Sequence, residues 1–417
     1  MDVRTPVNIW ELLFLSRSQA LNAPVVSGES ALIGLLTLAA FASVTNSLQM
    51  SPLLTALAAE YDTSESAIGQ LSAVSSLVGT AVALGIAPLL HRRPMRLWLQ
   101  VQCLVLITSV LMMCTAQSYD ALVAARIVAG VGGGAFLATC FTLASQIVRD
   151  PTRTGRAVAF VATGTTLASL AGVPIMAQIR ELANWRWASA FVALPLTLVF
   201  IGCFWLPGER AAHDGEISGR GAVGSVLKHR ATCLMLLAQL LLFVTYFGWF
   251  VYYAAYIEND FNGSASLISA LFIVAGLSEL SGNVAAPGLL RRFTGYAVTI
   301  AGFLGAAFAL LGSGNLFATT ATLFVAVALL NLCFSFMYVG SYTLLLELMP
   351  GHKATMMALA SAAVGLGAAL GALLGGGLLD ALDGYEPMYQ VLGIVMILAA
   401  GTVFASRRAG QSAKSEA

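Results

Sequence analysis

Long apolar stretches, separated by short polar connections, run along almost the whole chain. Each stretch reaches about 20 residues, the length at which an α-helix crosses the hydrocarbon core of a bilayer. The apolar runs are continuous, whereas the strands of a membrane β-barrel alternate in segments of about ten residues. The pattern therefore predicts an all-α membrane protein with twelve spans, at residues 31–57, 66–90, 97–117, 120–148, 157–180, 185–206, 231–257, 266–290, 296–315, 318–347, 354–379 and 386–405.

The longest polar connection, residues 207–230, divides the predicted spans six and six. It contains glycine and becomes basic toward its end, which is typical of a linker between two bundles, here residues 31–206 and 231–406. Residues 1–30 hold a short apolar stretch that Glu11 interrupts, unlike a secretory signal peptide. We expect residues 1–30 and 407–417 to be cytosolic tails.

The two halves resemble each other at a constant shift of 199 residues. Helix ends in any membrane protein carry proline and arginine, but one offset that holds across separated regions favours a repeat. Two parallel repeats predict two similar bundles with a substrate path between them. The matching pairs are Pro88 and Pro287, Leu90 and Leu289, Arg92 and Arg291, Arg93 and Arg292, Pro151 and Pro350, and Gly172 and Gly371.

Basic residues gather on one side of the predicted membrane. With the N-terminus in the cytosol, 18 of the 21 Lys and Arg residues fall in cytosolic segments. Arg180 and Arg186 lie on the opposite side, and Arg126 lies within a span. Because Lys and Arg concentrate in cytosolic loops, this distribution predicts a multi-pass protein with both termini in the cytosol.

Composition narrows the classes of function. The chain is 58% hydrophobic and 10% charged, with a net charge of +1, so a nucleic-acid partner is not indicated. The six cysteines lie in apolar segments without a C-x-x-C pair, and the four histidines lack ligand spacing, so we expect neither a metal nor another cofactor. The sequence contains no nucleotide-binding loop and no hydrolase motif, which argues against an enzyme.

Four local patterns add to this picture. Residues 87–96, APLLHRRPMR, follow the second span, and LVAARIVAGVGGG lies in the fourth. The fifth span spaces Gly155, Gly164 and Gly172 and continues into Val173 and Pro174, and NWRW opens the sixth. Together with the twelve spans and the repeat, these patterns resemble the major facilitator superfamily, in particular its drug:proton antiporters and arabinose-efflux-permease-like members. The resemblance covers residues 31–406.

The resemblance implies two pseudo-symmetric six-helix bundles, with spans 1, 4, 7 and 10 around a central cavity and transport by alternating access. Arg92 and Arg96 fall on arginines of the family's gating loop. His91 stands where the family usually has an aspartate that helps to lock the cytosolic gate. Arg126 falls on the arginine of the family's fourth-span motif, which implies a proton-relay or substrate-anion contact.

Two ionisable residues lie deep within predicted spans. A charge at that depth costs about 2.5–3.5 kcal/mol on insertion scales, so Arg126 must find partners inside the bundle; the structural alternative is bonding to neighbouring carbonyls. Glu279 is the only acid near the middle of a span. Burial disfavours its charged form, so we predict that it couples proton flow to transport. The alternative is a permanently neutral acid bonded to Asn283, one helical turn on.

The seventh span is rich in aromatic residues, some of which suit the membrane interface. Tyr246, Trp249 and Tyr253 share one face at helical spacing. An aromatic wall with nearby polar groups would suit an amphipathic or aromatic substrate, and the alternative is packing or lipid contact. The predicted cavity residues are Asn46, Gln49, Tyr246, Trp249, Tyr253, Asn331, Tyr338 and Tyr342.

Small residues let membrane helices approach each other closely. We expect this packing role for Gly164, Gly172 and Pro174 in the fifth span, and for Gly367 and Gly371 in the eleventh. The acids of the outer connections are expected to be merely solvated; they are Asp62, Glu65, Asp120, Asp260 and Asp383.

The sequence as a whole predicts a monomeric secondary transporter of the bacterial inner membrane that exports a small organic compound in exchange for protons. Its expected partners are that compound, protons and the lipid bilayer. Two alternatives stay open: proton-coupled uptake of a nutrient or organic ion, and a membrane-embedded sensor or enzyme on a transporter-like scaffold.

Overall fold

The computed structural model describes residues 27–86, 94–148, 151–206 and 220–415. Within these ranges eleven helices are long and apolar enough to cross a membrane, and a twelfth, Gly295–Leu311, is apolar but shorter. The predicted helical membrane architecture is therefore confirmed. The expected tail up to residue 26 and the gating-loop residues His91 and Arg92 lie outside the described residues.

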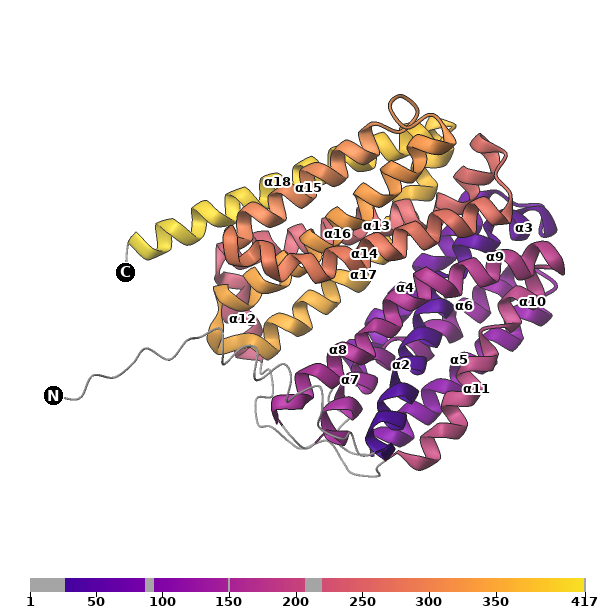
Figure 1. Cartoon of the computed structure of the whole chain (residues 1–417), viewed down its shortest axis with the longest axis horizontal. Coiled ribbons are helices and arrows are strands. Elements are labelled where there is room, and N and C mark those ends of the chain that lie inside the picture. The colour runs from indigo at the N-terminus through magenta and orange to yellow at the C-terminus, as the bar shows by residue number, and fades with distance from the viewer. Residues whose placement is uncertain (1–26, 87–93, 149–150, 207–219, 416–417) are drawn as a thin grey trace, which may run out of the picture.

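The first six spans form one bundle, and four of these spans are interrupted (Figure 1). Its helices are α2 (Ser27–Leu48) with α3 (Met50–Glu60), α4 (Glu65–Ile86), α5 (Met95–Thr115), α6 (Tyr119–Gly133) with α7 (Phe136–Ile147), α8 (Pro151–Leu167) with the π-helical turn η2 (Ala168–Gly172) and α9 (Val173–Leu182), and α10 (Trp185–Ala190) with α11 (Ala193–Gly202) and η3 (Cys203–Trp205).

Proline explains three of the four interruptions. A proline cannot donate to the carbonyl four residues earlier and its ring presses against that carbonyl. Pro52 acts in this way on Leu48, the last residue of α2, and Pro195 acts on residue 191, the turn between α10 and α11. Pro174 acts on residue 170, within η2, and π-helical turns commonly absorb such a mismatch. The fourth break follows the glycine run at 132–134.

The last six spans form the second bundle, and each is one continuous helix. They are preceded by a helix in the predicted linker, whose Val226 is fully buried. The final helix continues through Ser415, so most of the expected C-terminal tail is helical. The elements are α12 (Arg220–Lys228), α13 (Arg230–Phe261), α14 (Ala265–Arg292), α15 (Gly295–Leu311), α16 (Thr320–Leu348), η4 (Pro350–His352), α17 (Lys353–Leu382) and α18 (Tyr385–Ser415).

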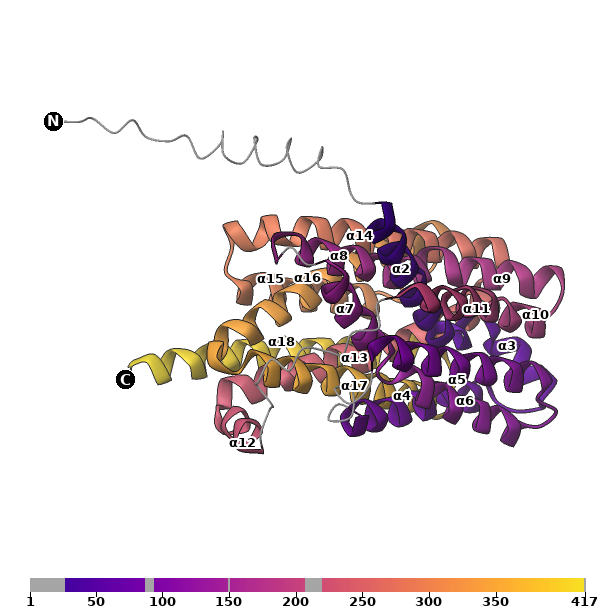
Figure 2. The same cartoon turned by 90° about the horizontal axis from the view of Figure 1, so that it is seen from below.

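The two bundles converge at one end and diverge at the other (Figure 1). We call these the closed end, where α3 and α9 lie, and the open end, where α2 begins and α18 finishes. A view turned by 90° shows α4 and α17 side by side (Figure 2), in agreement with their extensive packing. The bundles meet along two seams: the α4–α17 seam, and the α8–α14 seam, in which α8, η2 and α9 follow α14.

Candidate functional site

Hydrogen bonds cross the closed half of the α8–α14 seam. The Glu181 carboxylate accepts from the backbone N–H of Ala265 at 3.0 Å, which satisfies a free donor at the start of α14. One turn deeper, the Gln178 amide donates to the Ser269 hydroxyl at 3.1 Å. That hydroxyl donates in turn to the Pro174 carbonyl at 3.3 Å. Because each bond joins one bundle to the other, they must break if this end opens.

The same seam continues toward the open end through a close helix contact and one polar pair. A Cβ added to Gly276 would lie 2.8 Å from the Cβ of Leu170, so the helices touch here because residue 276 lacks a side chain. Beyond this contact, the Thr166 hydroxyl donates to the Glu279 carboxylate at 3.4 Å. The predicted membrane-embedded acid therefore lies at the divide between the bundles.

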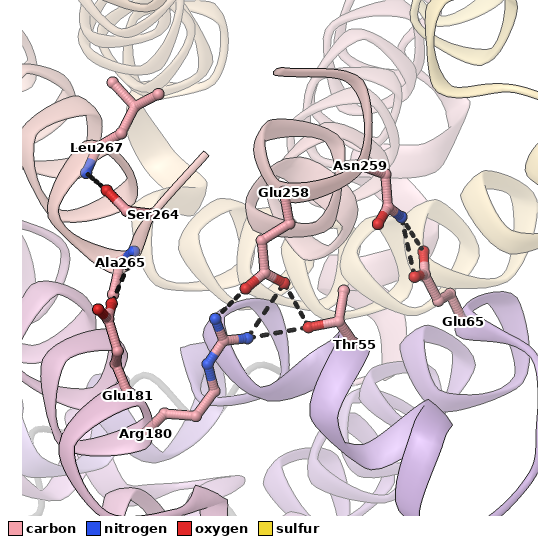
Figure 3. A network of polar contacts seen from close by, with 9 residues as sticks. All are labelled: Thr55, Glu65, Arg180, Glu181, Glu258, Asn259, Ser264, Ala265 and Leu267. Carbon is pink, nitrogen blue, oxygen red and sulfur yellow. Dashed lines mark hydrogen bonds and ion pairs between the residues drawn. The ribbon is translucent and has the colours of Figure 1, made fainter. Parts of the chain in front are cut away.

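An ion pair reinforces the closed end (Figure 3). Arg180 of α9 pairs with Glu258 of α13, and its Nη1 lies 2.9 Å from the Thr55 hydroxyl, which also bonds Glu258. The Arg180 and Glu258 side chains are 12% and 21% exposed, so water reaches them only partly. They border a depression of about 720 Å³ that is also lined by Asn184 and Trp185. The sequence predicts Arg180 on the side of the membrane opposite to the cytosol, but it does not identify the partner of Arg180.

A second polar cluster corrects the expectation that Glu65 is merely solvated. Asn259 donates to both carboxylate oxygens of Glu65, at 2.9 and 3.2 Å, and Tyr385 also bonds this carboxylate. Glu65 begins α4, whereas Asn259 and Tyr385 belong to the second bundle, so this acid also bridges the two halves. Figure 3 shows its contact with Asn259.

The α4–α17 seam has its own series of contacts. At the closed end the Ser66 hydroxyl donates to Asp380 at 2.6 Å. Next, the fully buried ring of Tyr252 lies against Gly69 and Gly375, and its hydroxyl donates to a carbonyl of α17 at 2.8 Å. Farther along, Thr80 of α4 lies directly against Gly365 of α17.

Arg126 is only 2% exposed and is held inside the first bundle. Its guanidinium donates to the Asn46 carbonyl at 3.3 Å and to the Ser75 hydroxyl at 2.7 Å. The Gln49 amide donates to the same carbonyl, close to the break between α2 and α3, and its own oxygen accepts from Ser189. Arg126 thus ties α6 to α2 and α4, and in the described part of the chain no acid forms an ion pair with it.

Glu279 has different surroundings. Its side chain is half-buried, and the hydroxyl of Ser335 donates to its backbone carbonyl at 2.8 Å. Tyr246 of α13 and Tyr338 of α16 lie within electrostatic reach of its carboxylate. Among the described residues its side-chain hydrogen bond goes to Thr166 rather than to Asn283, and no cation forms an ion pair with it.

The predicted aromatic wall separates into two groups. Tyr246 stacks on Phe334 with ring centroids 4.0 Å apart, and Phe334 stacks on Tyr338, whose side chain is 38% exposed. Tyr342 extends this group, 4.8 Å from Tyr338.

Trp249 and Tyr253 instead pack inside the second bundle. They border a small cavity of about 20 Å³ together with Tyr256 and Tyr389. The amide of Asn331 donates to the Val327 carbonyl of its own helix, and its side chain is buried. These three predicted cavity residues therefore contribute to packing in this conformation, whereas Tyr246 and Tyr338 lie within electrostatic reach of Glu279.

The predicted packing glycines lie at close helix approaches within each bundle. Gly164 and Gly172 contact Thr37 and Thr45 of α2. Pro174 lies two residues after η2 and acts on residue 170 within it, as described above. Gly367 and Gly371 contact the backbone of α13, where an added Cβ on Gly367 would lie 2.6 Å from the Leu240 carbonyl oxygen. Arg96, the described member of the gating loop, is half-buried at the start of α5.

The arrangement of two helical bundles with polar seams at one end defines a class of membrane transport protein. The family model of the Major Facilitator Superfamily matches residues 35–314 and 236–417. The chain belongs to this superfamily. It is a secondary transporter that works by alternating access between the two sides of a membrane.

Individual relatives are distant in sequence but similar in length. The chain is 27% identical over 386 residues to the "Transcription regulatory protein OpdE" of Pseudomonas aeruginosa, covering 90% of this chain and 94% of that protein. It is 24% identical over 396 residues to the "Purine ribonucleoside efflux pump NepI" of Escherichia coli, covering 93% and 96%. A bacterial homologue of the lysosomal transporter Spinster, solved in an inward-facing and unoccupied conformation, shares the fold with a TM-score of 0.74 and 14% identity, covering 93% and 99%.

Proposed function

We propose that this transporter exports a small organic compound in exchange for protons, and that Glu279 carries the exchanged proton. The observation that carries the proposal is the position of this acid: half-buried, without an ion-pair partner in the described part of the chain, and bonded across the divide to Thr166. A carboxyl in such surroundings can hold or release a proton at a modest free-energy cost, which coupling requires.

In this proposal the open end faces the cytosol of a bacterial cell, with both termini on that side of the inner membrane. The distribution of Lys and Arg supports this orientation. Substrate enters from the open end, the bundles rock about the two seams, and the closed-end contacts break to release it outside. We place the chain among the drug:proton antiporters and arabinose-efflux-permease-like transporters, acting as a monomer.

The substrate proposed for this site is an aromatic or amphipathic molecule. Tyr246, Phe334 and Tyr338 offer stacked rings beside the Glu279 carboxylate, and aromatic rings bind planar groups by stacking. The relative named as a purine ribonucleoside efflux pump covers nearly the full chain, which makes purine ribonucleosides the first compounds to test.

The test uses the purified protein in vesicles with an imposed pH gradient and a radiolabelled purine ribonucleoside. We expect Glu279→Gln to reduce gradient-driven transport to near the level of protein-free vesicles, because an amide cannot exchange a proton. Substrate exchange without a gradient should persist, which controls for folding. Unchanged gradient-driven transport in the variant would remove Glu279 from the coupling mechanism. Accumulation driven in the opposite direction would favour uptake.

A second candidate function is sensing. It is favoured by the similarity to a protein named as a transcription regulator, since the match covers 94% of that protein. A sensor would bind its compound without moving it. Saturable binding to the reconstituted protein, combined with no transport in either direction under any gradient, would favour this candidate over export.

A further inference from the structure

The contacts of the α8–α14 seam follow one antiparallel register. Each step of one or two helical turns along the first-bundle span is matched by an equal step in the opposite direction along α14. The last pair lies farthest toward the open end, and among the described residues it is the final hydrogen bond of the seam in that direction. In order the pairs are Glu181 with Ala265, Gln178 with Ser269, Leu170 with Gly276, and Thr166 with Glu279.

Thr166 differs from its neighbours in the use of its hydroxyl. Threonines in membrane helices usually donate to a carbonyl one turn back in their own helix. Thr163 and Thr165 do so, at 2.6 and 2.7 Å. The Thr166 hydroxyl instead donates to Glu279 in the other bundle, and its side chain is 8% exposed.

We propose that Thr166 is a positioning residue that sets the proton affinity of Glu279 according to whether the seam is closed. This proposal rests on the coupling role of Glu279 given above. A hydroxyl that donates to a carboxylate stabilises the ionised form. Since Thr166 and Glu279 belong to different bundles, the donor is in place only while this part of the seam is intact. By reciprocity, protonation of Glu279 weakens the seam by the same free energy.

The other groups around Glu279 cannot replace this donor. Tyr246 of α13 and Tyr338 of α16 lie within electrostatic reach of it, but both belong to its own bundle and therefore move with it. Ser335 of α16 binds its backbone carbonyl rather than its carboxylate. Among the described residues, Thr166 is thus the one side chain of the first bundle that is hydrogen-bonded to the Glu279 carboxylate.

The experiment measures protonation of Glu279 directly and needs no substrate. Dicyclohexylcarbodiimide modifies protonated carboxyls in apolar surroundings, so mass spectrometry of the labelled full-length protein across a pH series gives the pH of half-labelling. We expect Thr166→Val, which keeps the side-chain shape and removes the donor, to raise this pH by about half a unit to one unit. Thr166→Ser, which keeps the donor, should stay close to the wild type.

A disulfide between Leu170→Cys and Gly276→Cys provides a second measurement, because it holds the seam closed. Oxidation should lower the pH of half-labelling when Thr166 is present and leave it unchanged in Thr166→Val. Equal values for the wild type and Thr166→Val would overturn the proposal. The coupling role of Glu279 is tested separately. Normal gradient-driven transport by Glu279→Gln would reject that role, but it would not change the difference in the pH of half-labelling between the wild type and Thr166→Val.

Discussion

The two seams are related by the internal repeat, yet some of their equivalent contacts differ. The 199-residue shift carries Ala265 and Glu181 onto Ser66 and Asp380. In both seams an acid at the closed end accepts a hydrogen bond from the start of the opposing helix, from a backbone N–H in one and a side-chain hydroxyl in the other. The same contact in both halves indicates that it belongs to the common architecture.

The same shift carries Thr166 and Glu279 onto Gly365 and Thr80, which also touch each other. At this level one seam contains an acid hydrogen-bonded to a threonine, and the other contains a threonine against a glycine. In the proposed mechanism, proton-dependent control requires an acid at this level in only one of the two seams, while the other seam can specialise in close packing. Tyr252, which fills the space beside Gly69 and has no aromatic equivalent at Leu53, shows the same specialisation.

The largest expected effect comes from fixing each seam in turn with a disulfide. One variant pairs Leu170→Cys with Gly276→Cys, and the other pairs Thr80→Cys with Gly365→Cys. A Cβ at Gly276 would lie 2.8 Å from that of Leu170, and one at Gly365 would lie 3.2 Å from that of Thr80. Disulfides need about 3.5–4.5 Å, so a small separation of the helices suffices.

Oxidation of either pair should abolish transport, and a reductant should restore it, because a covalent link across either seam prevents the two bundles from parting there. The measurement is transport in vesicles before and after reduction, with each single cysteine variant as control. Full activity in a completely cross-linked sample would show that the seams do not separate during transport.

Much of the fold could be predicted because the bilayer imposes a simple pattern. A span must be long, apolar and helical, so most ends of the predicted spans lie within a few residues of the ends of the observed helices. The breaks were harder, although three of them follow from Pro52, Pro174 and Pro195 acting on the residue four positions earlier.

The partners of the site residues could not be predicted in the same way. Glu279 stood out because an acid inside a span is costly, but its contact with Thr166 depends on how two bundles meet. For the same reason Glu65, which looked like an ordinary loop acid, proved to bridge the halves. The two cations predicted on the side opposite to the cytosol are a usable signal, since Arg180 and Arg186 each pair with an acid.

A smaller effect is expected from adding one methyl group to the packing seam. In Gly365→Ala the new Cβ would overlap the Thr80 hydroxyl, which should force α4 and α17 apart and lower transport about tenfold, since overpacking costs about 1–3 kcal/mol. Adding Thr80→Ala should restore most of the activity. Gly377→Ala is the matched control, because no atom lies within 4 Å of a Cβ at that position of the same helix.

The smallest effect is expected at the ion pair that only one seam carries. The repeat places Leu379 and Ala59 at the positions equivalent to Arg180 and Glu258, so Glu258→Gln removes a charge that has no counterpart. Both groups are partly exposed, so the change should weaken closure by about 1 kcal/mol or less, which is at most about a fivefold shift in the open-to-closed ratio.

The rate at which the Leu170→Cys and Gly276→Cys pair oxidises reports how often that seam is closed, and it should fall a few-fold in Glu258→Gln. Glu60→Gln is the matched control: Glu60 pairs with Arg186 at 2.9 Å near the same end, but both belong to the first bundle. That variant should leave the oxidation rate unchanged. High salt should reduce the difference between wild type and Glu258→Gln, because screening weakens the intact pair. An equal fall in both variants would mean that surface charge in general, rather than a bond between bundles, governs closure.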